Sequence, residues 1–222
     1  MWLTAFLSSL ILLQAYMNGG FETAFQRAHG VAFLSRHHLE PSQGRFLVAT
    51  RTLIDPRFRE KVVLLVHHDE QAVVGLIINH PTKVPLSHAF PDRKMTKRKE
   101  ESVHIGGPVN LKQVFWLIRM SNSLEDERGM PKMRKVFSNI YLGSHEERLE
   151  TAIEELKPYE DLRVYMGYAG WTVNQLQNEI DSGHWLVWDA DPALIFDFDS
   201  SKVWQEMIRR TTVMQALGNL LP

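Results

Sequence analysis

The sequence predicts an α+β fold in which strands and helices are largely segregated along the chain. Short β-branched or aliphatic runs bounded by turn residues start at Gly44 and dominate the middle of the sequence. Helical patterns are fewer, carry N-terminal caps and come late. Because the strands cluster early, the pattern differs from the regular alternation of a parallel βαβ chain.

Composition places the chain among ordinary globular proteins. With 222 residues, 44% hydrophobic and 23% charged, it can bury the core of one domain with appendages. The formal net charge of -1 provides no long-range attraction for nucleic acid or an anionic membrane. The sequence contains no cysteine, which excludes disulfides, thiolate nucleophiles and Cys-ligated metal sites.

Residues 1–21 form an uncharged hydrophobic leader. Its apolar run, residues 2–17, has a length between a secretory h-region and a spanning helix. We therefore expect a signal peptide or an anchor, which favours an exported (periplasmic) or membrane-anchored protein over a cytoplasmic one. No Lys or Arg precedes the run, so a buried helix, an oligomer contact or a start-site artefact remain alternatives. Residues 22–43 are expected to be a linker.

The strand signals follow one another from Gly44 onward. The expected strands are residues 45–50, 61–67, 73–79, 113–119, 136–141, 162–167 and 185–188. Between the first two, Asp55-Pro56 predicts a type I turn, with Asp accepting a local hydrogen bond and Pro presetting φ. The polar stretches 92–102 and 121–135 are expected to be loops.

Three helices are expected in the second half. Ser144 and Glu147 form a capping box ahead of an apolar stripe, and Thr172 and Gln175 form another. Gly183 is a candidate C-cap for the second helix. A third helix is expected over residues 201–216. The side chains expected to be buried are Leu149, Ala152, Ile153 and Leu156 in the first helix, Val173, Leu176 and Ile180 in the second, and Val203, Trp204, Met207 and Ile208 in the third.

Four ordered motifs resemble the AlgH/YqgE family. They are the DP-x-F segment (Asp55, Pro56, Phe58), GLIINHP (Gly75 to Pro81), HIGGPV (His104 to Val109), and GYAGW with the residues after it (Gly167 to Trp171, Gln175, Leu176, Glu179, Ile180, Trp185). The resemblance implies a strongly curved, barrel-like antiparallel β-sheet flanked by α-helices, with residues 44–222 as the domain. The family carries a putative transcriptional-regulator label without an agreed activity. This chain departs from the family pattern at Val74, His80 and Asn174.

Catalytic chemistry finds little support in the sequence. There is no GxSxG elbow, and no serine lies inside the motif segments. His67 and Asp69 could share one face of a strand, but a metal needs three or four ligands, and no HxxxH or HExxH spacing occurs. We therefore assign no catalytic residue, no metal and no cofactor.

Gly106 and Gly107 permit two interpretations. Backbone N–H groups at this pair could bind an anion. However, no Lys-Ser/Thr follows, the GxGxxG pattern is absent and Pro108 removes a donor. The other interpretation is a tight turn that lets two chain segments approach closely.

The GYAGW segment is the strongest candidate for a binding site. A strand that ends there and feeds a capped helix places Gln175 and Glu179 on one helix face. Tyr168 and Trp171 offer flat apolar contact with polar tips. We expect Trp171 to belong to the core and Glu179 to the surface. In the alternative, Trp171 plugs the barrel and Gln175 bonds a neighbouring turn.

From the sequence we therefore expect a non-catalytic binding or regulatory module that uses the GYAGW/NHP surface for a small molecule or a protein partner. The candidate binding residues are Asp55, Pro56, Asn79, His80, Pro81, Gly106, Gly107, Tyr168, Trp171, Gln175 and Glu179. An enzyme with Glu179 or Asp55 in acid–base roles and a transcriptional regulator are the alternatives. Direct DNA binding is expected to be weak, and membrane contact could occur through residues 1–21.

Overall fold

The computed structural model describes residues 39–93, 97–120, 133–144, 146–156 and 161–218. The expected leader, residues 1–21, and most of the expected linker lie outside these ranges. Residues 40–209 form one compact unit, and residues 210–222 are grouped with residues 1–39 in a second. The first unit carries the whole sheet.

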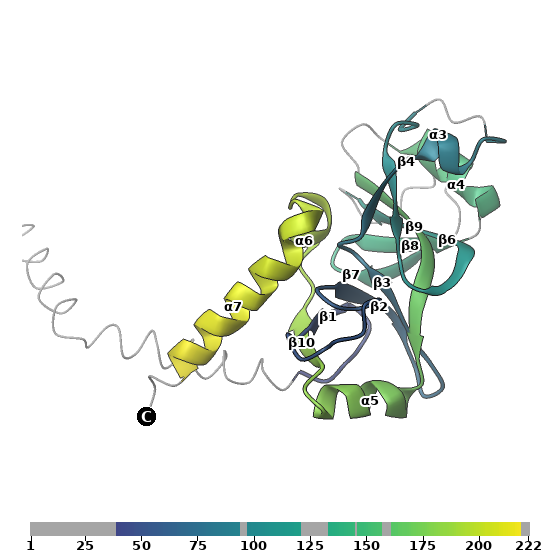
Figure 1. The fold of residues 1–222 in the computed structure, drawn as a ribbon. Coiled ribbons are helices and arrows are strands. Elements are labelled where there is room, and N and C mark those ends of the chain that lie inside the picture. Colours follow the sequence, from purple (N-terminus) through teal and green to yellow (C-terminus); the bar gives the residue numbers. More distant parts are fainter. Residues whose placement is uncertain (1–38, 94–96, 121–132, 145, 157–160, 219–222) are drawn as a thin grey trace, which may run out of the picture. The chain divides into compact units, whose positions relative to one another are not determined.

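Ten strands make up one curled, half-barrel sheet, which confirms the expected α+β, barrel-like architecture (Figure 1). The path along the sheet is β10 (Trp185–Asp189), β1 (Arg45–Ala49), β2 (Val62–His68), β3 (Val73–Ile77), β9 (Asp161–Trp171), β6 (Val109–Arg119), β8 (Ile140–Ser144) and β7 (Arg134–Phe137). Off this path, β5 (Ser102–Ile105) pairs with β9 and with β4 (Pro81–Pro85). All pairs are antiparallel except β5 with β9.

Strand β9 is the hub of the sheet. It pairs with β6 over most of its length, with β5 at Tyr165 and Met166, and with β3 from Ala169 onward. Gly167 lies where the partner changes and has φ +73°, a left-handed conformation that favours glycine. The strand therefore bends at Gly167 as it passes from β5 to β3.

Five helices accompany the sheet in the described ranges. They are α3 (Leu86–Ala89), α4 (Glu146–Glu155), α5 (Val173–Asp181), α6 (Pro192–Phe196) and α7 (Val203–Gly218), which follows a 3₁₀ turn at Ser200–Lys202. Figure 1 shows α3 and α4 together at one end of the sheet and α5 at the other. The expected stripe of α4 is fully buried. In α5, Leu176 is buried, and Val173 and Ile180 are only partly so.

Alternation along the central strands separates two apolar clusters. On β6, Val114, Trp116 and Ile118 pack with the buried stripe of α4. Phe115 and Leu117 face the other cluster, which includes residues of α6 and the start of α7. The central strands of the sheet are consequently buried on both faces.

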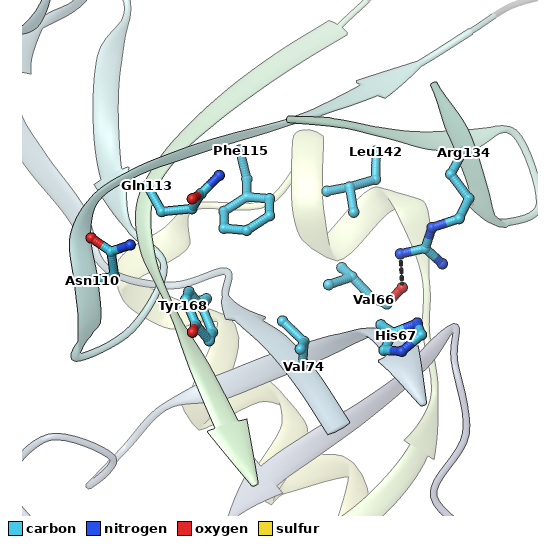
Figure 2. Close-up of a pocket in the computed structure, with 9 residues that line it drawn as sticks. All are labelled: Val66, His67, Val74, Asn110, Gln113, Phe115, Arg134, Leu142 and Tyr168. Carbon is cyan, nitrogen blue, oxygen red and sulfur yellow. Dashed lines mark hydrogen bonds between the residues drawn. The ribbon is translucent and has the colours of Figure 1, made fainter. Parts of the chain in front are cut away.

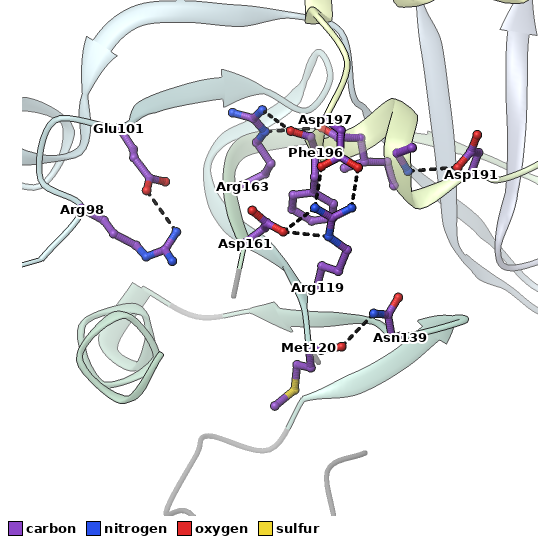
Figure 3. Close-up of polar contacts among 12 residues, drawn as sticks. Arg98, Glu101, Arg119, Met120, Asn139, Asp161, Arg163, Asp191, Phe196 and Asp197 are labelled. Atoms are coloured by element: carbon purple, nitrogen blue, oxygen red, sulfur yellow. Dashed lines mark hydrogen bonds and ion pairs between the residues drawn. The ribbon is translucent and has the colours of Figure 1, made fainter. Parts of the chain in front are cut away.

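A guanidinium links the end of the central strands to the segment after α6. Arg119 of β6 donates to Asp161 at 2.7 Å and to Asp197 at 2.5 and 2.7 Å (Figure 3). Arg163 of β9 donates to the backbone oxygens of Ile195 and Phe196. The hydrogen bond from Arg119 lowers the pKa of Asp197. These contacts hold α6 against the sheet.

Several expected boundaries differ from the observed ones. The single strand expected at 136–141 is a hairpin, because Ser138 adopts φ +44° and turns the chain between β7 and β8. Strands β4 and β5 were not expected, since prolines and a histidine interrupt their apolar pattern. Strand β9 continues to Trp171, beyond the expected end at Gly167.

The expected linker also contributes to the domain. Gln43 donates to the backbone oxygens of Lys135 and Val136 at 3.1 and 3.0 Å. The domain therefore begins before Gly44. Among the residues that the structure describes, no helix has the length and apolar character needed to cross a membrane.

A Gly107→Ala substitution should be strongly destabilising. A Cβ at Gly107 would lie 2.1 Å from the backbone carbon of Tyr168, which cannot move without disturbing β9. We expect a loss of about 3 kcal/mol, the upper part of the overpacking range. Gly170→Ala is the matched control, because its Cβ would lie 3.3 Å from the nearest atom, in the Tyr168 ring, and 4.0 Å from the nearest backbone atom, Val73 O. Denaturant unfolding measures both, and equal losses would show that the backbone approach is not limiting.

Candidate functional site

Trp171 belongs to an aromatic cluster beneath α5, as expected. Its side chain is 5% exposed, and its ring centroid lies 5.8 Å from that of Phe58 and 6.0 Å from that of Trp185. Phe58 also packs edge-on against Trp185 at 5.7 Å. The DP-x-F and GYAGW motifs therefore meet in one packed cluster.

Glu179 was expected at the surface, but the structure shows it partly buried, with its carboxylate engaged by other side chains. Its carboxylate accepts from the indole nitrogens of Trp171 at 3.1 Å and Trp185 at 2.8 Å, and from Gln175 Nε2 at 2.9 Å. Buried indole N–H groups need an acceptor, and this carboxylate is theirs. Gln175 bonds Glu179 and not a neighbouring turn, so the partner suggested in the alternative interpretation is wrong.

Asp55, Pro56 and Asn79 shape local turns. Phe58 N donates to Asp55 O at 3.0 Å and Arg57 N donates to Asp55 Oδ1 at 2.9 Å, which confirms the expected turn. The hydrogen bond from Arg57 lowers the pKa of Asp55. Asn79 accepts from Val62 N at 2.8 Å and donates to Glu60 O at 2.9 Å. Both polar side chains thus have internal partners.

His80 and Pro81 lead into the short β4–β5 pair, where Pro81 lies opposite His104. His104 is buried, and its Nδ1 has no hydrogen-bond partner among the described residues. Burial lowers the pKa of His104 to about 4, and the charge of Arg163 acts in the same direction. The ring packs against Tyr165, at 5.4 Å between centroids. His104 is therefore held neutral inside the sheet.

Gly106 and Gly107 form the close approach that was expected as the alternative to an anion site. A Cβ at Gly106 would lie 2.3 Å from Gly167 O. Gly106 N donates to Met166 O, and Gly106 O accepts from Ile77 N, each at 2.8 Å. The Gly106 amide is therefore occupied by the sheet.

Tyr168 is the one residue of the GYAGW segment whose ring faces a cavity. Because it lies three positions before Trp171 on the same strand, the two rings point to opposite faces of the sheet. The Tyr168 ring packs edge-on against Phe115 of β6 at 6.0 Å. Tyr168 thus leaves the aromatic cluster of Trp171 and joins a different surface.

That surface is a depression of about 370 Å³, which we call the Tyr168 hollow (Figure 2). Residues of β2, β3, β6, β7, β8 and β9 line it: Val66, His67, Val74, Asn110, Gln113, Phe115, Arg134, Leu142 and Tyr168. The register of β6 against β9 shifts between Val109 and Val114, so Asn110, with φ +42°, and Gln113 lie at a bulge. Such a bulge redirects side chains toward the cavity.

The polar groups of the hollow differ in whether they have hydrogen-bond partners within the protein. His67 Nε2 pairs with Asp69 Oδ2 at 2.9 Å, although Asp69 lies just past the end of β2. Arg134 donates to Val66 O at 2.6 Å and also bonds Gln43 Oε1. The side-chain amides of Asn110 and Gln113 make no hydrogen bond within the described part of the chain. Amides without partners at the rim of a cavity are available to a ligand.

Of the eleven candidate residues, the sequence therefore identified only Tyr168 in this hollow. Gln113 and Phe115 alternate on one strand and could have been linked to a common face. Arg134 fell in an expected loop, where periodicity carries no signal. Within the described ranges, no group of three His, Cys, Asp or Glu side chains is arranged to hold a metal ion.

Comparison with known proteins gives consistent relatives. A family model described as AlgH-like matches residues 46–216. A UPF0301 protein of Streptomyces coelicolor is 34% identical over 168 residues, which cover 75% of this chain and 85% of that protein. A UPF0301 protein of Mycobacterium tuberculosis is 29% identical over 170 residues, covering 75% and 81%. The names of these relatives state no activity.

Two solved structures share the fold. A crystal structure of a Corynebacterium diphtheriae protein has a TM-score of 0.65 and 26% identity, covering 81% of this chain and 92% of that one. The solution structure of the AlgH protein from Pseudomonas aeruginosa has a TM-score of 0.61 and 26% identity, covering 78% and 93%. The likeness thus extends over most of each chain.

Removing the Glu179 carboxylate should lower the free energy of unfolding far more than removing the side-chain amide of the exposed Gln175. Glu179→Ala leaves the buried indole N–H groups of Trp171 and Trp185 without acceptors, which should cost about 2–4 kcal/mol. Gln175→Ala, the matched control on the same helix face, should stay within about 0.5 kcal/mol. Denaturant unfolding of both variants tests this. A loss below about 1 kcal/mol for Glu179→Ala would contradict the structural role.

Stability should fall in acid through His104. Its pKa is about 4 in the folded protein against an ordinary 6.5, so the unfolded chain takes up the proton more readily. The stability that the protein gains by keeping His104 neutral is fully present above pH 6.5. It is lost as the pH falls toward 4, and the free energy of unfolding decreases by about 3 kcal/mol in all. In His104→Phe, this part of the pH dependence should vanish. His88→Phe, at an exposed position, is the control and should leave this pH dependence unchanged. Denaturant unfolding at several pH values measures the free energy of unfolding of both variants.

Proposed function

This chain belongs to the AlgH-like family, and we propose that it is a non-catalytic binding or regulatory module that holds a small molecule in the Tyr168 hollow. The observation that carries the proposal is a hollow of about 370 Å³ with an apolar floor and unpartnered amides at its rim. Ligand sites in proteins are commonly concave, mostly apolar and equipped with a few polar groups. The GYAGW segment contributes Tyr168 to this site.

The engagement of the candidate carboxylates supports binding over catalysis. Asp55 is paired with Arg57 at 2.6 Å, and its lowered pKa makes it a weaker base. Glu179 accepts from two indoles and one amide. A general base needs an accessible carboxylate beside a reacting group, and both of these are committed to the fold.

The distribution of charge supports weak DNA binding. The basic residues near α3 face carboxylates: Arg93 lies 3.5 Å from Glu146, and Lys97 lies 4.0 Å from Glu154. With a net charge of -1, few phosphates could be neutralised at once. A regulatory role would therefore act through a bound molecule or protein partner instead of direct contact with DNA.

A metabolite and fragment screen by two-dimensional ¹H–¹⁵N NMR on the full chain tests the proposal. Ligands should shift the backbone amides of residues 109–115, His67 and Tyr168 together. Gln113→Leu removes a rim amide at similar size and should weaken binding about tenfold. Gln177→Leu, on α5 away from the hollow, should leave it unchanged.

Two results would overturn the proposal. Ligand-induced shifts confined to the Trp171 cluster or to α5 would place the binding site elsewhere. Conversion of a ligand to a product, seen as new ligand signals over time, would favour the enzyme alternative.

A further inference from the structure

The Tyr168 hollow has two chemically different ends. Figure 2 shows Arg134 and His67 on one side and Asn110, Gln113 and Tyr168 on the other, with apolar side chains between them. The apolar floor consists of Val66, Val74, Phe115 and Leu142. A ligand that matches this surface carries a charged group at the Arg134 end and has room for a neutral polar group at the other end.

Arg134 is the group that sets the sign of that charge. Its guanidinium donates to Val66 O and to Gln43 Oε1, both of which are neutral acceptors. No carboxylate pairs with Arg134 anywhere in the described ranges. Partial burial of the guanidinium lowers the pKa of Arg134, although the residue as a whole is exposed.

The neighbouring charges leave Arg134 uncompensated. His67 is taken by Asp69, with 2.9 Å between Nε2 and Oδ2. Asp69 in turn accepts from the backbone N–H groups of Gln71 and Ala72, each at 2.9 Å. The Asp69 carboxylate is therefore committed to its own turn and to His67, and the cation at this end of the hollow has no paired anion among the residues that the structure describes.

We propose that the hollow binds a small organic carboxylate, with the carboxylate on Arg134 and a compact apolar body over Phe115, Val74 and Tyr168. This rests on the proposed function and names its ligand class. A guanidinium pairs with a planar carboxylate through parallel N–H···O bonds, and such charge-assisted bonds are stronger than neutral ones. The amides of Asn110 and Gln113 then meet a polar group at the far end of the ligand.

The size of the hollow favours a compact ligand. Its volume of about 370 Å³ lies near the lower end of the usual range for small-molecule sites, about 300–1,000 Å³. The apolar floor accommodates a short hydrocarbon or a single aromatic ring. The probe 3-phenylpropionate has this shape, and 3-phenylpropanamide is its neutral counterpart of nearly equal size.

The decisive experiment titrates the unmodified full chain with these two probes, followed by ¹H–¹⁵N NMR. The carboxylate should shift the amides of residues 109–115 and the Nε–H signal of Arg134. It should bind at least about tenfold more tightly than the amide, as expected for a charge-assisted hydrogen bond. Equal affinity for the two probes, or no shift in the hollow with 3-phenylpropionate, overturns the inference.

Variants separate the charge of Arg134 from its structural contacts. Arg134→Gln should abolish the preference for the carboxylate, and Arg134→Lys should retain part of it, because the charge remains and the planar fork is lost. Arg51→Gln changes the net charge equally at an exposed position outside the hollow and should bind as the wild type does. If Arg134→Gln keeps the full preference, the assignment of the carboxylate to Arg134 is wrong.

The outcomes distinguish this inference from the proposed function. If neutral ligands bind in the hollow and 3-phenylpropionate is not preferred, the proposed binding function is supported and the inference of a carboxylate ligand is wrong. Failure of every ligand in the wider screen to shift residues of the hollow removes both.

Discussion

The close crossing of two backbone segments, at Gly106-Gly107 and at Gly167-Tyr168, is the constraint on which the rest of the structure depends. A Cβ at Gly106, Gly107 or Gly167 would lie between 2.1 and 2.6 Å from backbone atoms of the opposite segment. Because of this crossing, β5 pairs in parallel with β9 at Tyr165, and β3 replaces β5 as the partner of β9 beyond Gly167. Ile77 and Met166 complete the contact through backbone hydrogen bonds to Gly106, both at 2.8 Å. Without it, β9 could not serve three partners.

The position of the hollow follows from that crossing. Once the chain passes Gly107 and Pro108, it must enter β6 beside Tyr168, and the register with β9 recovers only at Val114. The intervening residues form the bulge that contributes Asn110 and Gln113. The same strand geometry places Tyr168 on the face opposite Trp171. The crossing that brings β5, β9 and β3 together thereby also produces a cavity with polar groups at its rim.

The sequence predicted the fold better than the site, for physical reasons that particular residues make clear. Periodicity and caps located the α4 stripe, the Thr172 cap and most strands, because burial imposes regular spacing. The hairpin was missed because its turn, Ser138-Asn139, contains neither Gly nor Pro and was interpreted as part of one continuous strand. The expected strand ended at Gly167, and GYAGW was interpreted as one surface. Since β9 continues to Trp171, alternation divides the segment between a packed cluster and the hollow.

The distinctive motifs are therefore a guide to the constraints of this fold more than to its ligand. Asn79, Gly106 and Glu179 all have their hydrogen-bonding groups engaged inside the protein, so a ligand would have to displace existing bonds to use them. The hollow instead draws on Asn110 and Gln113, which lie outside the GLIINHP and GYAGW segments and have amides free to pair. Changes at such positions would alter what the hollow accepts with little effect on the crossing. The glycine crossing and the lining of the hollow can consequently vary almost independently in sequence.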